Sequence, residues 1–424
     1  MKDVWVQRYR DHCRVPDTNN VDVLTAFNAN IDVMFDVEDM NLDFEDVESE
    51  DLDELENIKD LKSMLKYCME EGINEEASLE GLEHSFDSGE ERIGGQAGIM
   101  ANYLSGMGNS VIFYTPFLSQ ELADMINVNV LFPTIEDDFV LKNVRDAANT
   151  DRTKKNMIFE FDSEKTGRLI ASDSIKGFGP YFRKSIVEGF DEMDQNLDRV
   201  LISGFHDVEG NKEAKLEKAR KQLDEIETLT HMEYVNTDDK TAEKIIKKIF
   251  PKIDSVGLDE EEAKQVREIV KSEDTEGELT TGHAFKLGKE LIEDFDLSRC
   301  QVHTYNFHIT VVEDDYPVET EKIRDAMLFG EISAIKTAER GSIVQRKDLK
   351  DLDMEDKHIK RMDMLEDFAD FFQIDNFVRD GTGKVEGYRV AAIPTIIHED
   401  PKRVVGMGDI LSSGAFVGEV MKNP

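Results

Sequence analysis

Residues 388–416 read YRVAAIPTIIHEDPKRVVGMGDILSSGAF. The apolar, β-branched run from Val390 to Ile397 predicts a buried strand. A polar turn with Pro401 follows, and Gly406-Met407-Gly408-Asp409 then opens a run whose apolar residues have helical spacing. The stretch therefore predicts a strand that leads through a glycine turn into a helix.

The glycine turn predicts an anion pocket. Two glycines at a helix start leave backbone N–H groups unpaired and directed outward, and the positive end of the helix dipole adds to their effect. A neighbouring carboxylate, Asp409, could accept a proton while the amides of Gly406 and Gly408 hold charge developing on a phosphoryl group. Phosphoryl transfer to a hydroxyl needs these two parts. The alternative is that Asp409 only caps the helix.

Strands and helices alternate through the rest of the chain, which predicts parallel βαβ units and an α/β fold. The predicted strands are 21–27, 110–117, 156–161, 168–172, 200–206, 232–236 and 255–258, with a long strand region at 299–312. The predicted helices are 97–104, 213–229, 241–250, 259–270, 281–295, 322–339 and 358–372, and a turn is expected at 380–387.

The 424 residues suffice for one large α/β domain and a smaller one. The net charge is −41, from 92 acidic and 51 basic residues, and no basic stripe is visible, so nucleic acid is not an expected partner. Acid spread over a whole chain repels itself unless salt screens it. We infer adaptation to a salty cytoplasm; an ordinary acidic surface is the alternative.

The remaining composition predicts a soluble, cytoplasmic protein. Cys13, Cys68 and Cys300 are far apart and lack metal-binding spacing, which favours a reducing compartment without disulfides. The first residues contain no apolar core for a signal peptide, and no stretch reaches the ~18 apolar residues of a membrane span. The oligomeric state stays open, with a monomer favoured.

Asn28, Asn30 and Asp32 follow a predicted strand at alternate positions, so they share one face of an extended chain. Amide and carboxylate groups suit a polyhydroxylated ligand, whose hydroxyls both donate and accept; a turn rich in Asn and Asp is the alternative. Gly94 and Gly95 allow close approach of a ligand, yet the Lys-Ser/Thr of a P-loop is absent.

Charged clusters occupy the segments between these motifs. A basic island comprises Lys142, Arg145, Arg152, Lys154 and Lys155, and Arg183-Lys184 follows later. It could dock a phosphate of the substrate, or it could be ordinary surface charge. Residues 38–56 read as an acidic surface insert, followed by a helical stretch to Gly72 and a loop carrying Glu75 and Glu76.

Four acids, Asp259 to Glu262, open the helix that follows the predicted strand 255–258. Carboxylates there stabilise the helix dipole. They could also hold a hydrated Mg²⁺, which keeps most of its waters, at the strand edge where ligands bind in open α/β sheets.

Taken together, these motifs resemble those of the archaeal ADP-dependent sugar kinases, a branch of the ribokinase-like superfamily, over nearly the full length. The resemblance rests on residues 27–32, 92–98, 158–161, 255–262, 303–305 and 405–416. It implies a ribokinase-like large α/β domain with a mostly parallel central sheet flanked by helices (1–32, 96–151 and 185–424). A smaller α/β lid made of insertions (33–95 and 152–184) is implied beside it, with the sugar bound between the two.

The resemblance also implies roles for individual positions. Asp409 corresponds to the catalytic base, and Gly406 and Gly408 to the anion hole. The implied sugar contacts are Asn28, Asn30, Asp32, Glu76, Gly95 and Gln96, and the cations that favour a phosphorylated sugar are Lys155, Arg168, Arg183 and Lys184. The implied nucleotide contacts are His303, Thr304, Val405 and Met407. Asp259 and Glu262 take the place of the family's Asn-x-x-Glu, where the glutamate orients the water shell of Mg²⁺.

The activity implied is that of an ADP-dependent phosphofructokinase of glycolysis. Such an enzyme transfers the β-phosphoryl of ADP to O1 of fructose 6-phosphate and releases AMP. Glucose is a second candidate substrate. The alternatives are an ADP-dependent glucokinase, an ATP-dependent kinase of the same superfamily, and a non-catalytic sugar-binding protein on the same fold.

Overall fold

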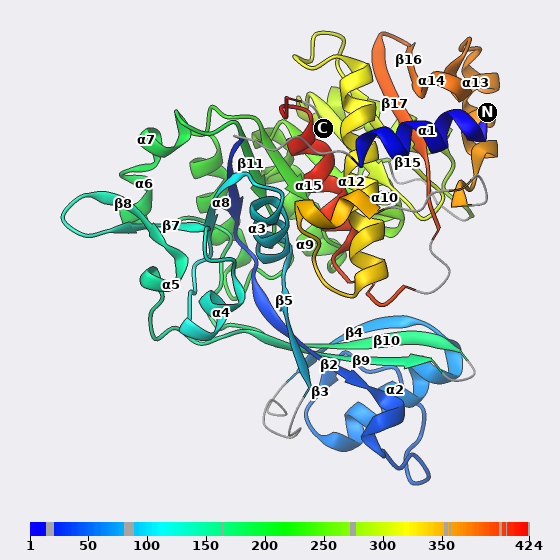
Figure 1. Cartoon of the computed structure of the whole chain (residues 1–424). Coiled ribbons are helices and arrows are strands. Elements are labelled where there is room, and N and C mark those ends of the chain that lie inside the picture. Colours follow the sequence, from blue (N-terminus) through cyan, green and yellow to red (C-terminus); the bar gives the residue numbers. More distant parts are fainter. Residues whose placement is uncertain are drawn as a thin grey trace.

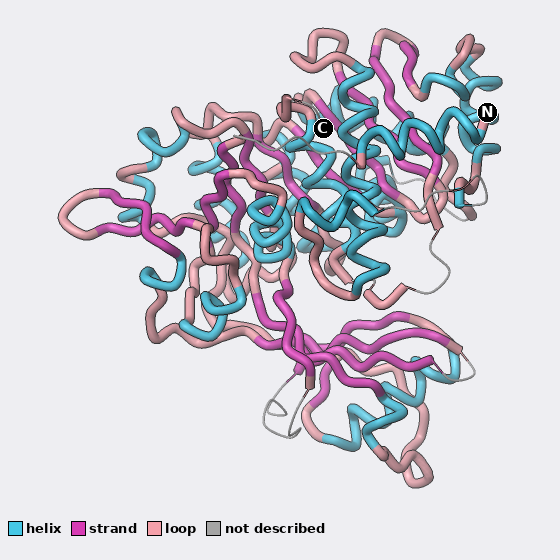
Figure 2. The backbone as a smooth tube through the Cα atoms, viewed as in Figure 1, coloured by secondary structure: helices cyan, strands magenta, loops and turns pink. Residues whose placement is uncertain are grey.

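The computed structural model describes residues 1–13, 21–79, 89–162, 165–271, 277–351, 355, 358–397, 401–403 and 405–422. Two β-sheets organise these residues (Figure 1). The larger sheet has the order β16-β17-β15-β14-β13-β12-β11-β1-β6-β7-β8, and the smaller has the order β3-β4-β10-β9-β2-β5. The tube view shows the strands of the smaller sheet as a group set apart from the helix-rich larger part (Figure 2).

The large sheet is parallel in its centre and antiparallel at both ends. Its parallel strands are β14 (Arg299–His303), β13 (Ser255–Leu258), β12 (Thr230–Glu233), β11 (Arg199–Ile202), β1 (Asp22–Ala26), β6 (Ser110–Tyr114) and β7 (Leu131–Ile135). The antiparallel strands are β15 (Phe307–Val312), β17 (Tyr388–Pro394) and β16 (Thr382–Val385) at one end, and β8 (Phe139–Asn143) at the other. Strands β11 to β14 are buried throughout, as expected for a sheet covered on both faces.

Helices cover the large sheet in two groups. The connections from β11 to β14 advance in one direction along the sheet and the step from β1 to β6 advances in the other, so right-handed crossovers place their helices on opposite faces. One group contains α8 (Lys212–Leu223), α9 (Asp239–Lys248), α10 (Glu260–Lys271) and α11 (Thr281–Phe295), packed in that order. The other contains α3 (Gln96–Gly106), α15 (Met407–Gly418), α12 (Thr320–Arg340) and α1 (Lys2–His12).

Shorter helices complete the large part at its edges. They are α4 (Gln120–Met125), α5 (Val144–Ala147), α6 (Lys184–Val187), α7 (Phe190–Asp194), α13 (Met362–Phe372) and α14 (Phe377–Asp380), with the 3₁₀ turns η2 (Phe250–Lys252) and η3 (Arg346–Asp351). No helix among the described residues is long and apolar enough to cross a bilayer.

The small sheet has a hydrophobic core of its own. It contains β3 (Glu54–Leu55), β4 (Asn74–Leu79), β10 (Thr166–Ser172), β9 (Lys155–Asp162), β2 (Asn30–Asp36) and β5 (Glu90–Gly94), with α2 (Ile58–Glu71) and η1 (Val37–Met40). Leu61, Leu65 and Cys68 of α2 pack with Phe159 and Leu169 in a cluster separate from the main core. The predicted α/β class, with a smaller α/β part beside a mostly parallel sheet, is confirmed. The proposed domain boundaries stay a prediction.

Helix α15, which carries the glycine turn, is fixed by close backbone contact with α12. A Cβ added to Gly414 would lie 2.9 Å from the Cα of Gly330, and one added to Gly330 would lie 2.4 Å from the carbonyl oxygen of Leu411. The hydroxyl of Tyr103 on α3 donates to Ser333 Oγ of α12 beside this contact. Helix α15 is therefore held between α3 and α12.

The structure corrects several sequence-based expectations. Residues 299–312 are two antiparallel strands joined by a turn, because Thr304 Oγ1 accepts the backbone N–H groups of Asn306 and Phe307. Glu75 and Glu76 lie on strand β4 and not in a loop, since β4 finds a parallel partner in β10. The expected turn at 380–387 contains strand β16, and the helix expected at 358–372 begins at Met362. The polar turn expected after β17 falls partly on residues 398–400 and 404, outside the described residues.

Candidate active site

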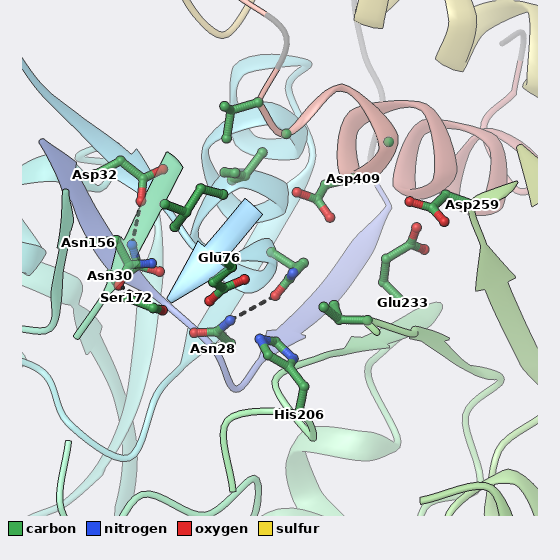
Figure 3. A pocket seen from close by; sticks show the side chains of 18 of the residues that line it. Asn28, Asn30, Asp32, Glu76, Asn156, Ser172, His206, Glu233, Asp259 and Asp409 are labelled. Atoms are coloured by element: carbon green, nitrogen blue, oxygen red, sulfur yellow. Dashed lines mark hydrogen bonds between the residues drawn. The ribbon is translucent and has the colours of Figure 1, made fainter. Parts of the chain in front are cut away.

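A cavity of about 360 Å³ lies between the two sheets. Strands β2, β4, β9 and β10 of the small sheet contribute Asn30, Asp32, Glu76, Asn156 and Arg168 to its lining. The large part contributes Gly406 to Asp409 at the start of α15, together with acids from β12 and α10. In the view of Figure 3, Asp409 is drawn between the polar groups of β2 and the acids Glu233 and Asp259.

The glycine turn has the geometry that the sequence predicts. Gly406 has φ +78 and precedes the first residue of α15, and a Cβ at this position would lie 2.7 Å from Ile99 Cδ1 of α3. A side chain would therefore be strained both by the backbone angle and by the packing. A Cβ on Gly408 would lie 2.9 Å from His303 Nε2. Both glycines let the turn approach its neighbours, and the first backbone N–H groups of α15 have no partner within the helix.

The carboxylate of Asp409 is buried at the cavity. Among the described residues, its carboxylate makes no hydrogen bond, and it caps no backbone N–H of α15. Burial raises the pKa of Asp409 to about 7; the charge of Arg403 acts against this shift, and that of Asp32 adds to it. A carboxylate with a pKa near neutrality is suited to general-base work near that pH.

The polar residues of β1–β2 form hydrogen-bonded pairs that face the cavity. Asn30 Nδ2 donates to Asp32 Oδ1 at 2.6 Å, and Asn28 Nδ2 donates to Gln96 Oε1 at 2.8 Å. A Cβ on Gly94 would lie 2.3 Å from Asp32 Oδ1, so only glycine fits there. Burial raises the pKa of Asp32 to about 6, and the bond from Asn30 opposes that shift. These groups and Gly95 line one wall of the cavity.

Only part of the predicted basic set reaches the cavity. Arg168 lines it, and its Nε is buried without a hydrogen-bond partner among the described residues. Lys154 also lines it, and its Nζ lies 2.7 Å from Asp207 Oδ2. Lys155 pairs instead with Glu91 and Glu121, and Arg183 donates to Asp151 Oδ2 at 3.3 Å. Lys155, Arg183 and Lys184 are not among the residues that line the cavity.

The acids of α10 form a reciprocal helix cap. The backbone N–H of Glu262 donates to Asp259 Oδ1 at 2.8 Å, and the N–H of Asp259 donates to Glu262 Oε2 at 2.7 Å. This is a capping box, in which each side chain satisfies the other residue's free donor. Both residues nevertheless line the cavity, so their remaining carboxylate oxygens are available to a ligand.

Glu233, at the end of β12, is a cavity residue that the sequence analysis missed. His231 Nε2 lies 3.1 Å from Glu233 Oε2, and His303 Nε2 lies 3.5 Å from Glu233 Oε1. Burial raises the pKa of Glu233 well above its usual value, and the charges of Asp409 and Asp259 add to this. An acid at the carboxyl end of a buried strand was the available signal. His206 and Asn156 also line the cavity and were not singled out.

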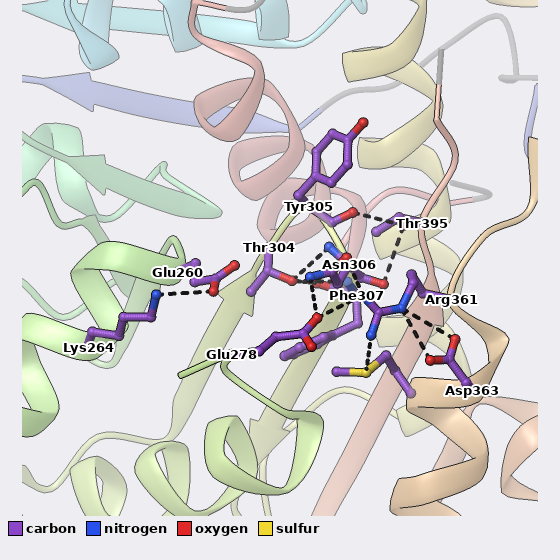
Figure 4. A network of polar contacts seen from close by, with 11 residues as sticks. Glu260, Lys264, Glu278, Thr304, Tyr305, Asn306, Phe307, Arg361, Asp363 and Thr395 are labelled. Atoms are coloured by element: carbon purple, nitrogen blue, oxygen red, sulfur yellow. Dashed lines mark hydrogen bonds and ion pairs between the residues drawn. The ribbon is translucent and has the colours of Figure 1, made fainter. Parts of the chain in front are cut away.

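The predicted nucleotide contacts divide into two kinds. His303, Val405 and Met407 line the cavity, and burial lowers the pKa of His303 to about 3, so its ring is neutral. Thr304 is buried and does not line the cavity, because its hydroxyl holds the β14–β15 turn. Figure 4 shows Tyr305 projecting from this turn, away from the polar network. Tyr305 is 71% exposed.

Comparison with known proteins finds a matching family and several relatives. The model of the ADP-specific phosphofructokinase/glucokinase conserved region matches residues 21–418. An ADP-specific phosphofructokinase of Pyrococcus abyssi is 29% identical over 367 residues, covering 79% of this chain and 80% of the relative. An ADP-dependent glucose/glucosamine kinase of Pyrococcus furiosus is 28% identical over 438 residues, covering 94% of each chain.

A solved ADP-dependent kinase, in complex with fructose-6-phosphate and ADPβS, has the same fold. It superposes with a TM-score of 0.83 at 24% identity and covers 100% of this chain and 99% of its own. The agreement extends over both the large part and the smaller sheet.

Proposed function

The chain belongs to the ADP-specific phosphofructokinase/glucokinase family, and from this premise we propose that it phosphorylates fructose 6-phosphate at O1, with ADP as donor. One observation carries the proposal. A single cavity is lined by the carboxylate of Asp409, by the glycine turn beside it, and by the hydrogen-bonded pairs Asn30–Asp32 and Asn28–Gln96. A proton acceptor, an anion pocket and a sugar-binding wall are thereby brought within one enclosed space.

The proposed step uses Asp409 as general base. Its carboxylate takes the proton of the O1 hydroxyl, and O1 forms a bond to the β-phosphorus of ADP. The bond from that phosphorus to the oxygen shared with the α-phosphate breaks, and the electron pair leaves with AMP. The N–H groups of the turn at Gly406 to Gly408 stabilise the charge on the transferring group. The products are fructose 1,6-bisphosphate and AMP.

The acids across the cavity fit a hydrated Mg²⁺. Burial raises the pKa of Glu262 well above its usual value, and repulsion from the charges of Asp259, Glu233 and Asp409 adds to this. A bound cation would relieve that repulsion. No three His, Cys, Asp or Glu side chains of the described residues are grouped closely enough to hold a metal directly. Contact through water suits Mg²⁺, which keeps several waters. Bound there by Glu233, Asp259 and Glu262, it would neutralise charge on the phosphates.

We assign the phosphate of the sugar to Arg168, with Lys154 beside it. Arg168 is a cavity cation with a buried, unpartnered donor, and a phosphate would satisfy that donor. Arg168→Met is expected to raise KM for fructose 6-phosphate about tenfold or more and to leave KM for glucose unchanged. An effect confined to KM for ADP would assign Arg168 to the nucleotide. The roles given to Lys155, Arg183 and Lys184 stay predictions.

Glucose is a second candidate substrate, and the position of Glu76 favours it. Strand β4 brings this acid to the cavity opposite the amides of β2, where a carboxylate can accept from a sugar hydroxyl. The Pyrococcus furiosus relative that matches 94% of this chain is named as a glucose/glucosamine kinase. Glu76 is paired with Ile170 across β4 and β10, and Arg168 lies two residues along β10. The same cavity therefore offers both an acceptor for glucose and a cation for a sugar phosphate.

The adenine end of ADP is assigned to the β14–β15 turn and the start of α15. His303, Val405 and Met407 face the cavity, and the exposed ring of Tyr305 offers a surface on which a base can stack. Arg361 Nη1 donates to Glu278 Oε1 at 2.8 Å and to Asn306 Oδ1 at 2.7 Å, which ties this turn to the segment before α13 (Figure 4).

A purified-enzyme assay tests the proposal. ADP and ATP are crossed against fructose 6-phosphate and glucose, in the presence of Mg²⁺ and at low and high KCl. We expect AMP and fructose 1,6-bisphosphate from the ADP arm, with activity rising with KCl because salt screens the self-repulsion of a chain with net charge −41. Turnover with ATP alone, or sugar binding without turnover in any arm, would contradict it. Cytoplasmic localisation and a monomeric state stay predictions.

A further inference from the structure

Arg403 hydrogen-bonds both to the turn before α15 and to strand β5 of the small sheet. Arg403 is 6% exposed. Its Nε donates to the carbonyl oxygen of Val405 at 2.9 Å, within the turn that leads into α15. Its Nη2 donates to the carbonyl oxygen of Ile93 at 3.5 Å, on strand β5 of the small sheet. One side chain therefore joins the turn that carries Asp409 to the strand that leads into Gly94 and Gly95.

The charge of Arg403 is surrounded by the acids of the site. Asp32 from β2 and Asp409 from α15 stabilise its guanidinium, as does Glu90, while Arg92 opposes them. In turn, Arg403 lowers the pKa of both Asp409 and Asp32. Glu233 of β12 and Glu262 of α10 are the further acids whose charge interacts with Asp409 across the cavity. An arginine keeps its charge at any pH that a protein tolerates, so this influence is constant.

We propose that Arg403 is a positioning residue for the phosphoryl transfer. It holds the catalytic turn against the end of β5, and its fixed charge favours the ionised carboxylate of Asp409. The proposal rests on Asp409 being the base, as argued above. Arg403 acts through Asp409 and contacts no reacting atom, which separates its role from that of a substrate ligand.

Two consequences follow for the kinetics. Loss of the charge raises the pKa of Asp409, so the acid limb of kcat/KM moves to higher pH. Loss of the two backbone bonds loosens the turn relative to the sugar wall, so kcat falls more than KM rises, because misplacement acts on the transition state.

Three variants separate charge from bonding. Arg403→Met removes both, Arg403→Lys keeps the charge but not the fork of donors, and Arg389→Met is the matched control. Arg389 donates through Nε and Nη1 to the carbonyl oxygens of Glu313 and Val318, and it is not among the residues that line the cavity. It thus has the same kind of backbone bonding as Arg403, away from the site.

For Arg403→Met we expect kcat to fall about tenfold or more, sugar KM to change less than about threefold, and the acid limb to rise by about one pH unit. Arg403→Lys should lose part of kcat with the limb unmoved, and Arg389→Met should change neither. If Arg403→Met cannot be purified, Arg403→Gln removes the charge, keeps two donors and must show the same shift of the limb.

An unmoved limb in the neutral variants, or the same shift in Arg389→Met, would overturn the proposal. The wild-type limb and the Asp409→Asn variant test the proposed function separately. If Asp409→Asn keeps its turnover, the assigned base is wrong; if only the Arg403 variants fail to respond, the base stands and the positioning role falls.

Discussion

The starts of two helices, α10 and α15, lie at the same cavity. Both carry acidic side chains, but those side chains make different hydrogen bonds. At α10, Asp259 and Glu262 exchange hydrogen bonds with each other's backbone N–H groups. At α15, Asp409 follows the left-handed Gly406, and its carboxylate has no hydrogen bond among the described residues. The sequence pattern is similar in both places, an acid in the first turn of a helix after a buried strand.

The difference shows how bonding separates a fixed anion from a proton acceptor. The reciprocal cap at α10 holds both carboxylates in one orientation, which suits a constant task such as holding the waters of a cation. The carboxylate of Asp409 does not cap a helix. Its pKa of about 7 results from burial, which raises the pKa, and from the charge of Arg403, which lowers it. Asp409 can therefore change protonation state without breaking a helix cap.

Replacement of Asp409 should have the largest effect on kcat. Asp409→Asn removes the proton acceptor and keeps the shape, so kcat should fall by ~10³-fold or more, with little change in sugar KM. The variant should also be more stable than the wild type above pH 7. The folded-state pKa of about 7 exceeds the usual value of 3.8, so the wild type loses stability as pH rises from 3.8 to about 7, and the loss is complete above 7. Steady-state kinetics and thermal unfolding at two pH values measure both.

Replacement of Glu262, the buried acid of the helix cap at α10, should have an intermediate effect on kcat. Glu262→Gln should lower kcat by ~10-fold to 100-fold and raise the Mg²⁺ concentration needed for half-maximal rate, because an amide holds metal-bound water less well. Glu261→Gln on the same turn is the control, since its side chain is 69% exposed and pairs with Lys264. Equal effects of the two substitutions would show that helix charge, and not the cavity, is responsible.

The turn itself can be perturbed without a change of charge. Gly406→Ala forces a left-handed φ on alanine and places its Cβ 2.7 Å from Ile99 Cδ1. We expect the free energy of unfolding to fall by ~1–3 kcal/mol and kcat to fall by about tenfold, as the anion pocket shifts. Denaturant unfolding and kinetics are compared with Gly210→Ala, whose φ is +72 but whose added Cβ meets no atom. Matching losses of kcat would place the effect in strain alone.

The smallest effect is expected at Asp259. Asparagine is an equally good helix cap, and its carbonyl oxygen can accept from the N–H of Glu262 as the carboxylate does. Asp259→Asn should therefore change kcat by less than about threefold and leave the melting temperature nearly unchanged. A loss as large as that of Glu262→Gln would mean that the charge of Asp259 is needed, and that its cap is only part of its role.

The sequence predicts the parts of this structure that depend on local pattern. Strand β13 and helix α11 have the predicted bounds, because apolar residues at alternate positions (Val256 and Leu258) and a capped amphipathic run each determine an element locally. The glycine turn and the polar positions of β2 were found for a similar reason, since unusual residue types at fixed spacing mark them.

The sequence could not predict features that depend on partners distant along the chain. The hairpin at 299–312 depends on the hydroxyl of Thr304, and strand β4 depends on β10, so neither was foreseen. The basic island is dispersed because acids from other segments, such as Asp207 and Glu91, pair with its members. The sequence marks Glu233 only as an acid at a strand end, and it enters the cavity because β12 ends beside α10 and α15.

The pH dependence of kcat/KM for fructose 6-phosphate tests the central claim most directly, because this ratio reports the essential groups of the enzyme form that has not yet bound the sugar. With ADP and Mg²⁺ saturating, Asp409 as base predicts a rate that rises with pH through a single ionisation near 7, its pKa in the structure. The same ionisation should be absent from the residual rate of Asp409→Asn. A profile that is level across this range in the wild type, or a limb that persists unchanged in Asp409→Asn, would contradict the account.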